Sequence, residues 1–184
     1  IYVQGAVAWP NAMFAARELG GRRQLTGNAL PTNHTSGVFP VRRDDPAYQI
    51  DRNPNAIAAQ NLAWSLPLVP ILLAEPACVP MGQIGVMLNG VAIFNALDAA
   101  GKDAVAHEVQ DQCNGHPERN GQYHYHGMPT HLIPKLNAAS ATSMTLVGWA
   151  ADGFPIYANL GYSTANSASS ALKEMKGSFR TKAT

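Results

Sequence analysis

Glycine and proline are spread along the whole chain, and their spacing limits the fold more than any other feature. The 184 residues contain 16 glycines and 13 prolines, and few stretches of ten residues lack both. Such spacing disfavours long helices and favours short strands joined by many turns. The length suits one domain with a sizeable core. We therefore expect a single domain over residues 1–184, mainly β, built as an antiparallel sandwich or a partly closed barrel with a few short helices and long loops.

Asn89-Gly90 gives the clearest local signal for a hairpin. It lies between two apolar runs, residues 84–88 and 91–94. Asn-Gly readily adopts the two positive φ angles of a type I′ turn, so these runs are predicted to form a β-hairpin with a two-residue turn. The remaining expected elements are strands at 57–68 and 144–151, a long loop at 24–56, short helices within 11–19, 96–109 and 170–176, and a flexible tail at 177–184.

Composition and charge exclude two classes of partner. Hydrophobic residues make up 46% of the chain, charged residues make up 14%, and the formal net charge is +1. The basic residues between Arg17 and Arg52 are interleaved with acidic ones, so no basic stripe forms and we expect no nucleic-acid binding. The most apolar stretch, residues 62–74, contains two prolines and is too short to span a membrane. We interpret this stretch as core.

The segment Tyr123-His124-Tyr125-His126 alternates two residue types with a period of two. Successive side chains of a strand point to opposite faces, so both histidines share one face and both tyrosines share the other. Neighbouring neutral imidazoles suit zinc, copper, iron or nickel. We predict a metal site at His124 and His126, with Tyr123 and Tyr125 packed beneath it and their hydroxyls hydrogen-bonded. The alternative is two half-buried histidines bonded to backbone carbonyls.

A zinc or copper site needs at least one more ligand, and His116 is the nearest further histidine in sequence. If Asn120-Gly121 formed a strict two-residue hairpin, His116 would pair with Tyr125 and lie on the tyrosine face. Pro117 cannot donate to a strand ladder, so we expect loop or bulge geometry that frees His116 from this pairing. The other available ligands are His34, His107, His131 and carboxylates such as Asp152.

Five ordered blocks of sequence carry a resemblance to a known family. The blocks are residues 28–40, 85–91, 111–117, 123–126 and 148–157. In this order they resemble the YHYH family, a group of mostly bacterial and environmental secreted proteins of largely unknown function named for that tetrapeptide. The resemblance is strongest over residues 25–157.

The resemblance implies a secreted or periplasmic protein with a histidine-rich candidate site. His107 lies between the blocks and is discounted. Asp152 precedes a glycine in a turn and could orient a ligand histidine by accepting its second ring N–H. The alternative for Asp152 is an Asx turn that bonds its own backbone. The ligands are expected among the histidines inside the blocks, which are His34, His116, His124 and His126.

The two cysteines, Cys78 and Cys113, are expected to form a disulfide if the protein is exported. The position of His131 often carries a cysteine in relatives, which leaves Cys78 to Cys113 as the one pairing available here. The alternative is two buried free thiols.

These features predict a secreted protein with a mononuclear histidine site for copper or zinc. Zinc with three protein ligands and one open position would lower the pKa of a bound water towards about 7, which makes hydrolysis feasible. Copper would suit oxidative chemistry or metal storage. The alternative is a metal-free module that binds an extracellular polysaccharide or cell-wall component through aromatic side chains: Trp149, Tyr157, Tyr123 and Tyr125, beside the Asn-rich region 28–55.

Overall fold

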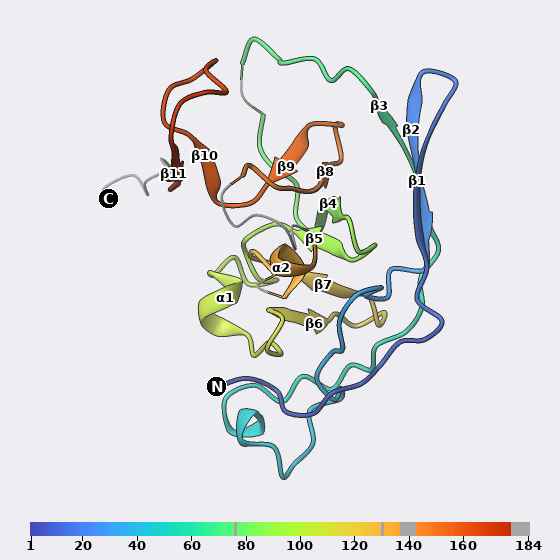
Figure 1. The fold of residues 1–184 in the computed structure, drawn as a ribbon. Helices are drawn as coiled ribbons and strands as arrows, with labels where there is room; N and C mark the ends of the chain where they lie inside the picture. Colours follow the sequence, from blue (N-terminus) through green and yellow to red (C-terminus); the bar gives the residue numbers. More distant parts are fainter. Residues whose placement is uncertain (76, 130, 137–142, 178–184) are drawn as a thin grey trace.

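Short strands dominate the computed structural model, which describes residues 1–75, 77–129, 131–136 and 143–177 (Figure 1). A three-stranded antiparallel sheet contains β1 (Phe14–Leu19), β2 (Arg22–Gly27) and β3 (Leu62–Pro67). A six-stranded sheet has the order β6 (Gly115–Pro117), β7 (Tyr123–Tyr125), β5 (Ala92–Phe94), β4 (Gln83–Met87), β8 (Leu146–Ala150) and β9 (Pro155–Tyr157). The remaining elements are the strand pair β10 (Leu160–Tyr162) and β11 (Leu172–Glu174), the 3-10 helix η1 (Pro46–Gln49), and the helices α1 (Ala104–His107) and α2 (Leu132–Leu136).

The mainly β fold with short helices and long loops is confirmed. The sheets are open, and the described residues form no closed barrel. One pair departs from the antiparallel expectation, because β5 and β7 run parallel. The predicted tail beyond Gly177 lies outside the described residues. No helix in the described part of the chain is both long and apolar enough to cross a membrane.

Two of the predicted helices are strands instead. The predicted helix at residues 11–19 contains β1, which continues through Gly20-Gly21 into β2 with Leu19 paired to Arg22. Both glycines have positive φ, 59° and 73°, as a type I′ hairpin turn requires. Strand β2 also occupies the start of the predicted loop, and the predicted helix at 170–176 contains β11. Cross-strand pairing outweighed local helix propensity at both places.

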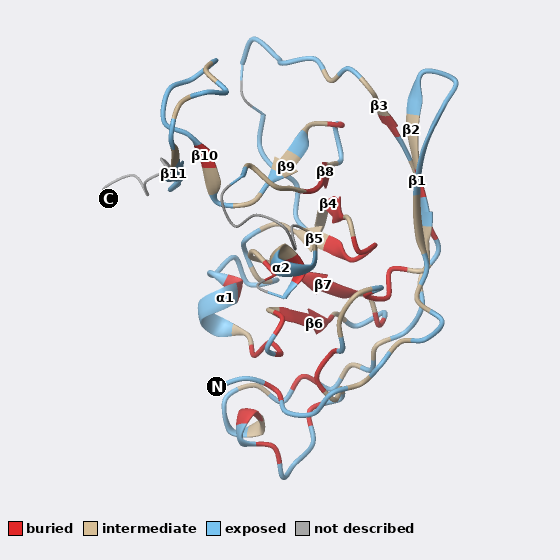
Figure 2. Cartoon of the chain, viewed as in Figure 1, coloured by how far each residue is buried: buried red, intermediate tan, exposed pale blue. Residues whose placement is uncertain are grey.

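The core of the six-stranded sheet contains the two tyrosines of the Tyr-His-Tyr-His run. Tyr123 and Tyr125 are both fully buried and are the largest such side chains in the protein. They pack in a cluster completed by Met87, Val91, Leu132 and Val147. Figure 2 shows this buried region where β5, β6 and β7 meet beneath α2. The tyrosines therefore anchor β7 in the core.

Both Asn-Gly pairs form three-residue loops. Across the first loop, the Met87 N–H donates to Val91 O at 2.8 Å, and across the second the Glu118 N–H donates to Gln122 O at 3.2 Å. Only the glycines have positive φ, 85° at Gly90 and 82° at Gly121. This is a type I turn followed by a left-handed glycine, so the predicted type I′ turn is wrong although the hairpin is present. The extra loop residue shifts each strand register by one.

The Asp111 carboxylate links the start of β6 to the segment around Gly37 through hydrogen bonds to both. This carboxylate is 1% exposed and accepts four hydrogen bonds. Its donors are Gly37 N at 2.9 Å, Tyr123 Oη at 2.7 Å, Cys113 N at 2.9 Å and Gly115 N at 3.2 Å. A buried carboxylate is tolerated when its oxygens are fully hydrogen-bonded, so Asp111 acts as a structural pin.

The Gly121 turn should be less tolerant of a side chain than the left-handed glycine Gly101. A Cβ at Gly121 would lie 2.8 Å from Ala58 Cβ and 2.9 Å from Ala56 O, whereas a Cβ at Gly101, with φ of 79°, meets nothing within 4 Å. We predict that Gly101→Ala costs about 1–2 kcal/mol of unfolding free energy from backbone strain alone. Gly121→Ala should cost at least about 1 kcal/mol more, because overpacking adds to that strain. Urea unfolding measures both, and equal costs would contradict the prediction.

Candidate metal centre

Three histidines converge on the face of β6 and β7 opposite the tyrosines. The three-residue loop places Gly115 opposite Tyr125 and His116 opposite His124. The strict two-residue register would have put His116 on the tyrosine face, so the longer loop reverses its orientation. His116 Nε2 lies 3.1 Å from His124 Nε2, which lies 3.0 Å from His126 Nε2. All three ligand nitrogens lie within 4.8 Å of one another.

Backbone carbonyls hold the other nitrogen of each ring. Nδ1 of His116 donates to Val109 O at 3.1 Å, that of His124 to Gln122 O at 3.0 Å and that of His126 to Asn95 O at 2.6 Å. A carbonyl oxygen can only accept, so the proton of each neutral ring is on Nδ1. Each Nε2 therefore presents a lone pair. The carbonyl bonds of the metal-free alternative are present, but they leave three lone pairs aimed at one another.

The imidazoles are neutral at neutral pH. Burial, reinforced by His126, lowers the pKa of His116 to about 4. Burial likewise lowers the pKa of His124 well below its usual value and lowers that of His126. The rings themselves therefore carry no proton between the converging lone pairs, and neutral imidazole is the form that binds metal.

Glu108 is a fourth polar group at this cluster. It follows helix α1, whose last turn it closes by donating its N–H to Ala104 O. Its Oε2 lies 3.6 Å from His116 Nε2 and 3.5 Å from His126 Nε2. The oxygen is buried and has no hydrogen-bond partner among the described residues, although the side chain as a whole is 32% exposed. Burial, with help from Asp98 and Asp51, raises the pKa of Glu108 to about 7.

Sequence reasoning missed Glu108. It lies between the blocks that carry the family resemblance and forms no ligand-spacing motif with the other site residues. The one available signal in the sequence was its position. Glu108 comes two residues before Gln110, just ahead of the block that begins at Asp111. Its approach to the histidines depends on the path of the chain after α1.

The cluster opens into a cavity of about 560 Å³. One wall is apolar and includes Phe94, which stacks on His124 with ring centroids 3.8 Å apart. The polar lining includes Asn53 and Asn55, and the three histidines and Glu108 also face this cavity. The cavity therefore adjoins the histidine cluster.

The tyrosine face is structural. Tyr123 donates to Asp111 at 2.7 Å, and the Tyr125 hydroxyl accepts from Asn89 Nδ2 at 2.9 Å. His34 also lies on this face, where its Nε2 contacts the Tyr125 hydroxyl and its Nδ1 donates to Thr35 O at 2.8 Å. The structure does not bring His34 together with His124, because the two side chains lie on opposite faces of β7, and His116 is the histidine that joins the pair.

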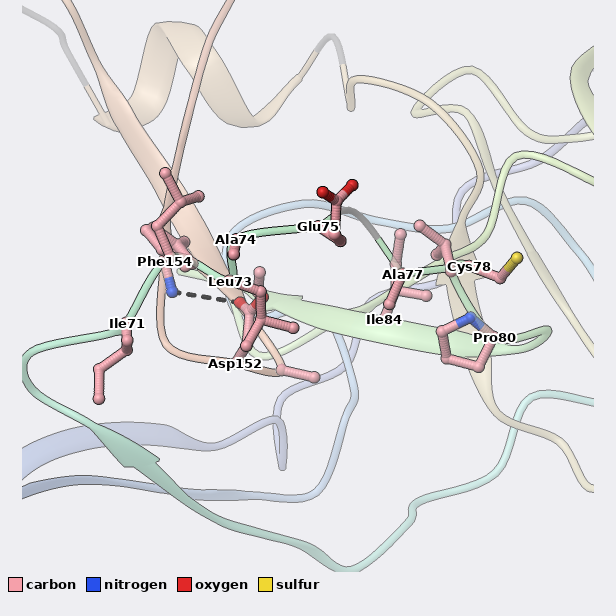
Figure 3. A pocket seen from close by; sticks show the side chains of 14 residues that line it. Ile71, Leu73, Ala74, Glu75, Ala77, Cys78, Pro80, Ile84, Asp152 and Phe154 are labelled. Carbon is pink, nitrogen blue, oxygen red and sulfur yellow. Dashed lines mark hydrogen bonds between the residues drawn. The ribbon is translucent and has the colours of Figure 1, made fainter.

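Asp152 lies in the turn between β8 and β9, away from the histidines. Its carboxylate accepts from Phe154 N at 3.4 Å and lines a separate cavity of about 640 Å³ (Figure 3). All three histidine rings donate to backbone carbonyls instead. The structure therefore gives Asp152 the hydrogen bond of an Asx turn and does not bring it to the histidines.

The predicted disulfide is absent, and both cysteines are free. Cys78 is exposed and lines the same cavity as Asp152 (Figure 3). Cys113 is buried on the tyrosine face, where its Sγ contacts His131 Nδ1 and the Thr35 carbonyl. The neighbour of Cys113 is thus His131 and not Cys78. The pairing fails because the two thiols belong to different parts of the fold.

Most of the aromatic side chains proposed to bind a polysaccharide are core residues. Tyr123 and Tyr125 are fully buried and Trp149 is 9% exposed, so none of them offers a ring face to a sugar. Tyr157 alone of the four is substantially exposed, at 42%. One exposed ring does not make a stacking platform.

Comparison with known proteins gives one match. A family model described as YHYH protein matches residues 63–184. The matched range includes His116, His124, His126 and Glu108, whereas His34 lies outside it. No curated protein and no solved structure matches the chain.

The two faces of β7 should respond differently to substitution. Tyr123→Phe removes the hydroxyl that bonds a buried carboxylate, and we predict a loss of about 1.5–3 kcal/mol of unfolding free energy. Tyr157→Phe, at an exposed position of the edge strand β9, should change stability by less than about 0.5 kcal/mol. Urea unfolding compares the two variants. A Tyr123→Phe protein as stable as the wild type would contradict the structural role assigned to this face.

Proposed function

The chain belongs to the YHYH protein family, and we propose that it binds a single copper or zinc ion through His116, His124 and His126. The observation that carries the proposal is the convergence of three buried Nε2 atoms whose Nδ1 protons are held by carbonyls. Lone pairs at 3.0–3.1 Å repel unless a positive charge lies between them. A metal ion supplies that charge.

The spacing supports an ion of this size. Zinc bonds to imidazole nitrogen at about 2.0–2.1 Å, which places neighbouring nitrogens of a tetrahedral site about 3.3 Å apart. The two separations at His124, 3.0 and 3.1 Å, are close to this value, whereas the three nitrogens together span up to 4.8 Å, so binding would draw His116 and His126 closer together. Imidazoles that bind metal usually donate their other ring N–H to a carbonyl or carboxylate, as these three do. Imidazole suits both copper and zinc.

The cavity supports exchange of a ligand at the ion. A site of about 560 Å³ beside three protein ligands leaves room for water or a small molecule to complete the coordination. With zinc, such a water would become acidic enough to act as a nucleophile near neutral pH. With copper, the same position would suit redox chemistry or metal transfer.

A secreted or periplasmic location and a single domain over the whole chain remain part of the proposal.

Metal analysis tests the proposal directly. Protein purified without a nickel column should bind about one equivalent of Zn²⁺ or Cu²⁺ by calorimetry and elemental analysis. Free metal at 100 times its dissociation constant should stabilise the fold by about 2.7 kcal/mol, seen as a higher melting temperature. His124→Ala should abolish both effects. His107→Ala, an exposed histidine on α1, is the matched control and should retain them. Wild-type protein that shows neither stoichiometric binding nor a thermal shift would overturn the metal assignment.

A further inference from the structure

We propose that Glu108 is the fourth protein ligand of this centre, so that the donor set is three nitrogens and one carboxylate oxygen and selects a divalent ion over Cu⁺. The inference rests on the proposed metal-binding function and narrows it: Glu108 fills the fourth position that three histidines alone would leave to water, so water would bind only as an added ligand or by displacing the carboxylate. It also specifies the oxidation state of the ion. It is carried by the position of one oxygen atom, Glu108 Oε2.

The four donor atoms form a closed ring. His124 Nε2 has His116 Nε2 at 3.1 Å and His126 Nε2 at 3.0 Å as neighbours. Glu108 Oε2 joins the same two nitrogens from the other side, at 3.6 and 3.5 Å. An ion bonded at about 2.0–2.1 Å in tetrahedral geometry separates its donors by about 3.3 Å. The four sides of the ring bracket that value, and the histidine nitrogens across it, which span up to 4.8 Å, would move closer together on binding.

Glu108 Oε2 also lacks any other partner. It is buried and accepts no hydrogen bond from the described residues. The two nitrogens closest to it carry lone pairs, because their rings donate from Nδ1, so they cannot supply a proton to the oxygen. A buried carboxylate oxygen beside lone pairs is costly, and a shared cation removes the cost for all four atoms.

The segment that follows α1 brings two groups to the site: the Glu108 carboxylate and the backbone carbonyl that accepts the His116 ring N–H. Glu108 follows α1 and directs its carboxylate towards His116 Nε2, while the next residue, Val109, accepts the Nδ1–H of the same ring at 3.1 Å. One dipeptide thus orients an imidazole and adds a donor beside it. This is the arrangement expected of a ligand rather than of a solvated surface acid.

A carboxylate changes which ion the site prefers. It is a hard anionic donor that offsets part of the charge of a divalent ion, whereas Cu⁺ is selected by soft thiolate and thioether donors. Loss of the carboxylate should therefore weaken Zn²⁺ binding and leave Cu⁺ binding to the three imidazoles nearly unchanged.

The test compares Glu108→Gln with Asp98→Asn in the full-length protein. Asp98 lines the same cavity, and its Oδ1 accepts from Ala100 N and Lys102 N, bonds that an asparagine oxygen can retain. Asp98→Asn therefore removes one negative charge near the centre without removing a proposed ligand. Zn²⁺ and Cu⁺ affinities are measured by competition with chromophoric chelators. The visible spectrum of the Co²⁺ form reports the coordination directly, and melting of the metal-free proteins confirms that each variant folds.

We expect Glu108→Gln to lower Zn²⁺ affinity by about 10- to 100-fold or more, to leave Cu⁺ affinity unchanged within error and to alter the Co²⁺ spectrum. Asp98→Asn should retain the wild-type spectrum and affinities. Wild-type affinity and spectrum in Glu108→Gln would overturn the ligand assignment while the three-histidine site stands. An equal loss in Asp98→Asn would assign the effect to charge and would also overturn it. Absence of metal binding in the wild type would instead refute the proposed function itself.

Discussion

The candidate site depends on the register between β6 and β7. The turn at Asn120-Gly121 contains three residues, with Gly121 in the left-handed region at φ of 82°. One residue fewer would turn His116 to the opposite face and remove it from the cluster, because strand side chains alternate with a period of two. The Ala58 N–H donates to the Gly121 carbonyl at 2.9 Å and ties the turn to a neighbouring segment. A left-handed glycine that is not part of the cavity lining therefore determines which histidines meet.

The register is supported by a polar anchor on the other face. Asp111 accepts from two backbone amides near β6, from Gly37 and from the Tyr123 hydroxyl. These bonds join the segment around residue 37 to both strands of the hairpin. Because the loss of a donor leaves a buried carboxylate oxygen short of a partner, each of the four bonds favours the arrangement that contains the other three. The tyrosines and Asp111 thus hold rigidly the strands whose opposite face carries the histidines.

The two faces of β7 differ in how their polar groups are satisfied. On the tyrosine face, the two hydroxyls and the Asp111 carboxylate have partners within the protein. On the histidine face, three Nε2 lone pairs and one carboxylate oxygen point at one another. Folding brings these four atoms together without a hydrogen-bond donor among them, and this arrangement supports the proposed metal site. The four residues also line the adjoining cavity.

Local sequence patterns were enough to recognise part of this protein. The dense glycine and proline predicted a mainly β fold of short strands, and the alternation of tyrosine with histidine predicted which side chains of β7 share a face. Both are properties of a few consecutive residues of extended or turning backbone.

Sequence patterns failed where remote segments meet. Helix propensity suggested helices at the places where cross-strand pairing forms β1 and β11. The number of cysteines suggested a disulfide, although the two thiols lie in different parts of the fold. The positions of His34 and Glu108 likewise depend on contacts between remote segments. His34 lies on the tyrosine face of β7, and the chain after α1 brings Glu108 to the histidines on the other face. Side-chain alternation is local to a strand, whereas the convergence of donor atoms from separate elements depends on how those elements pack.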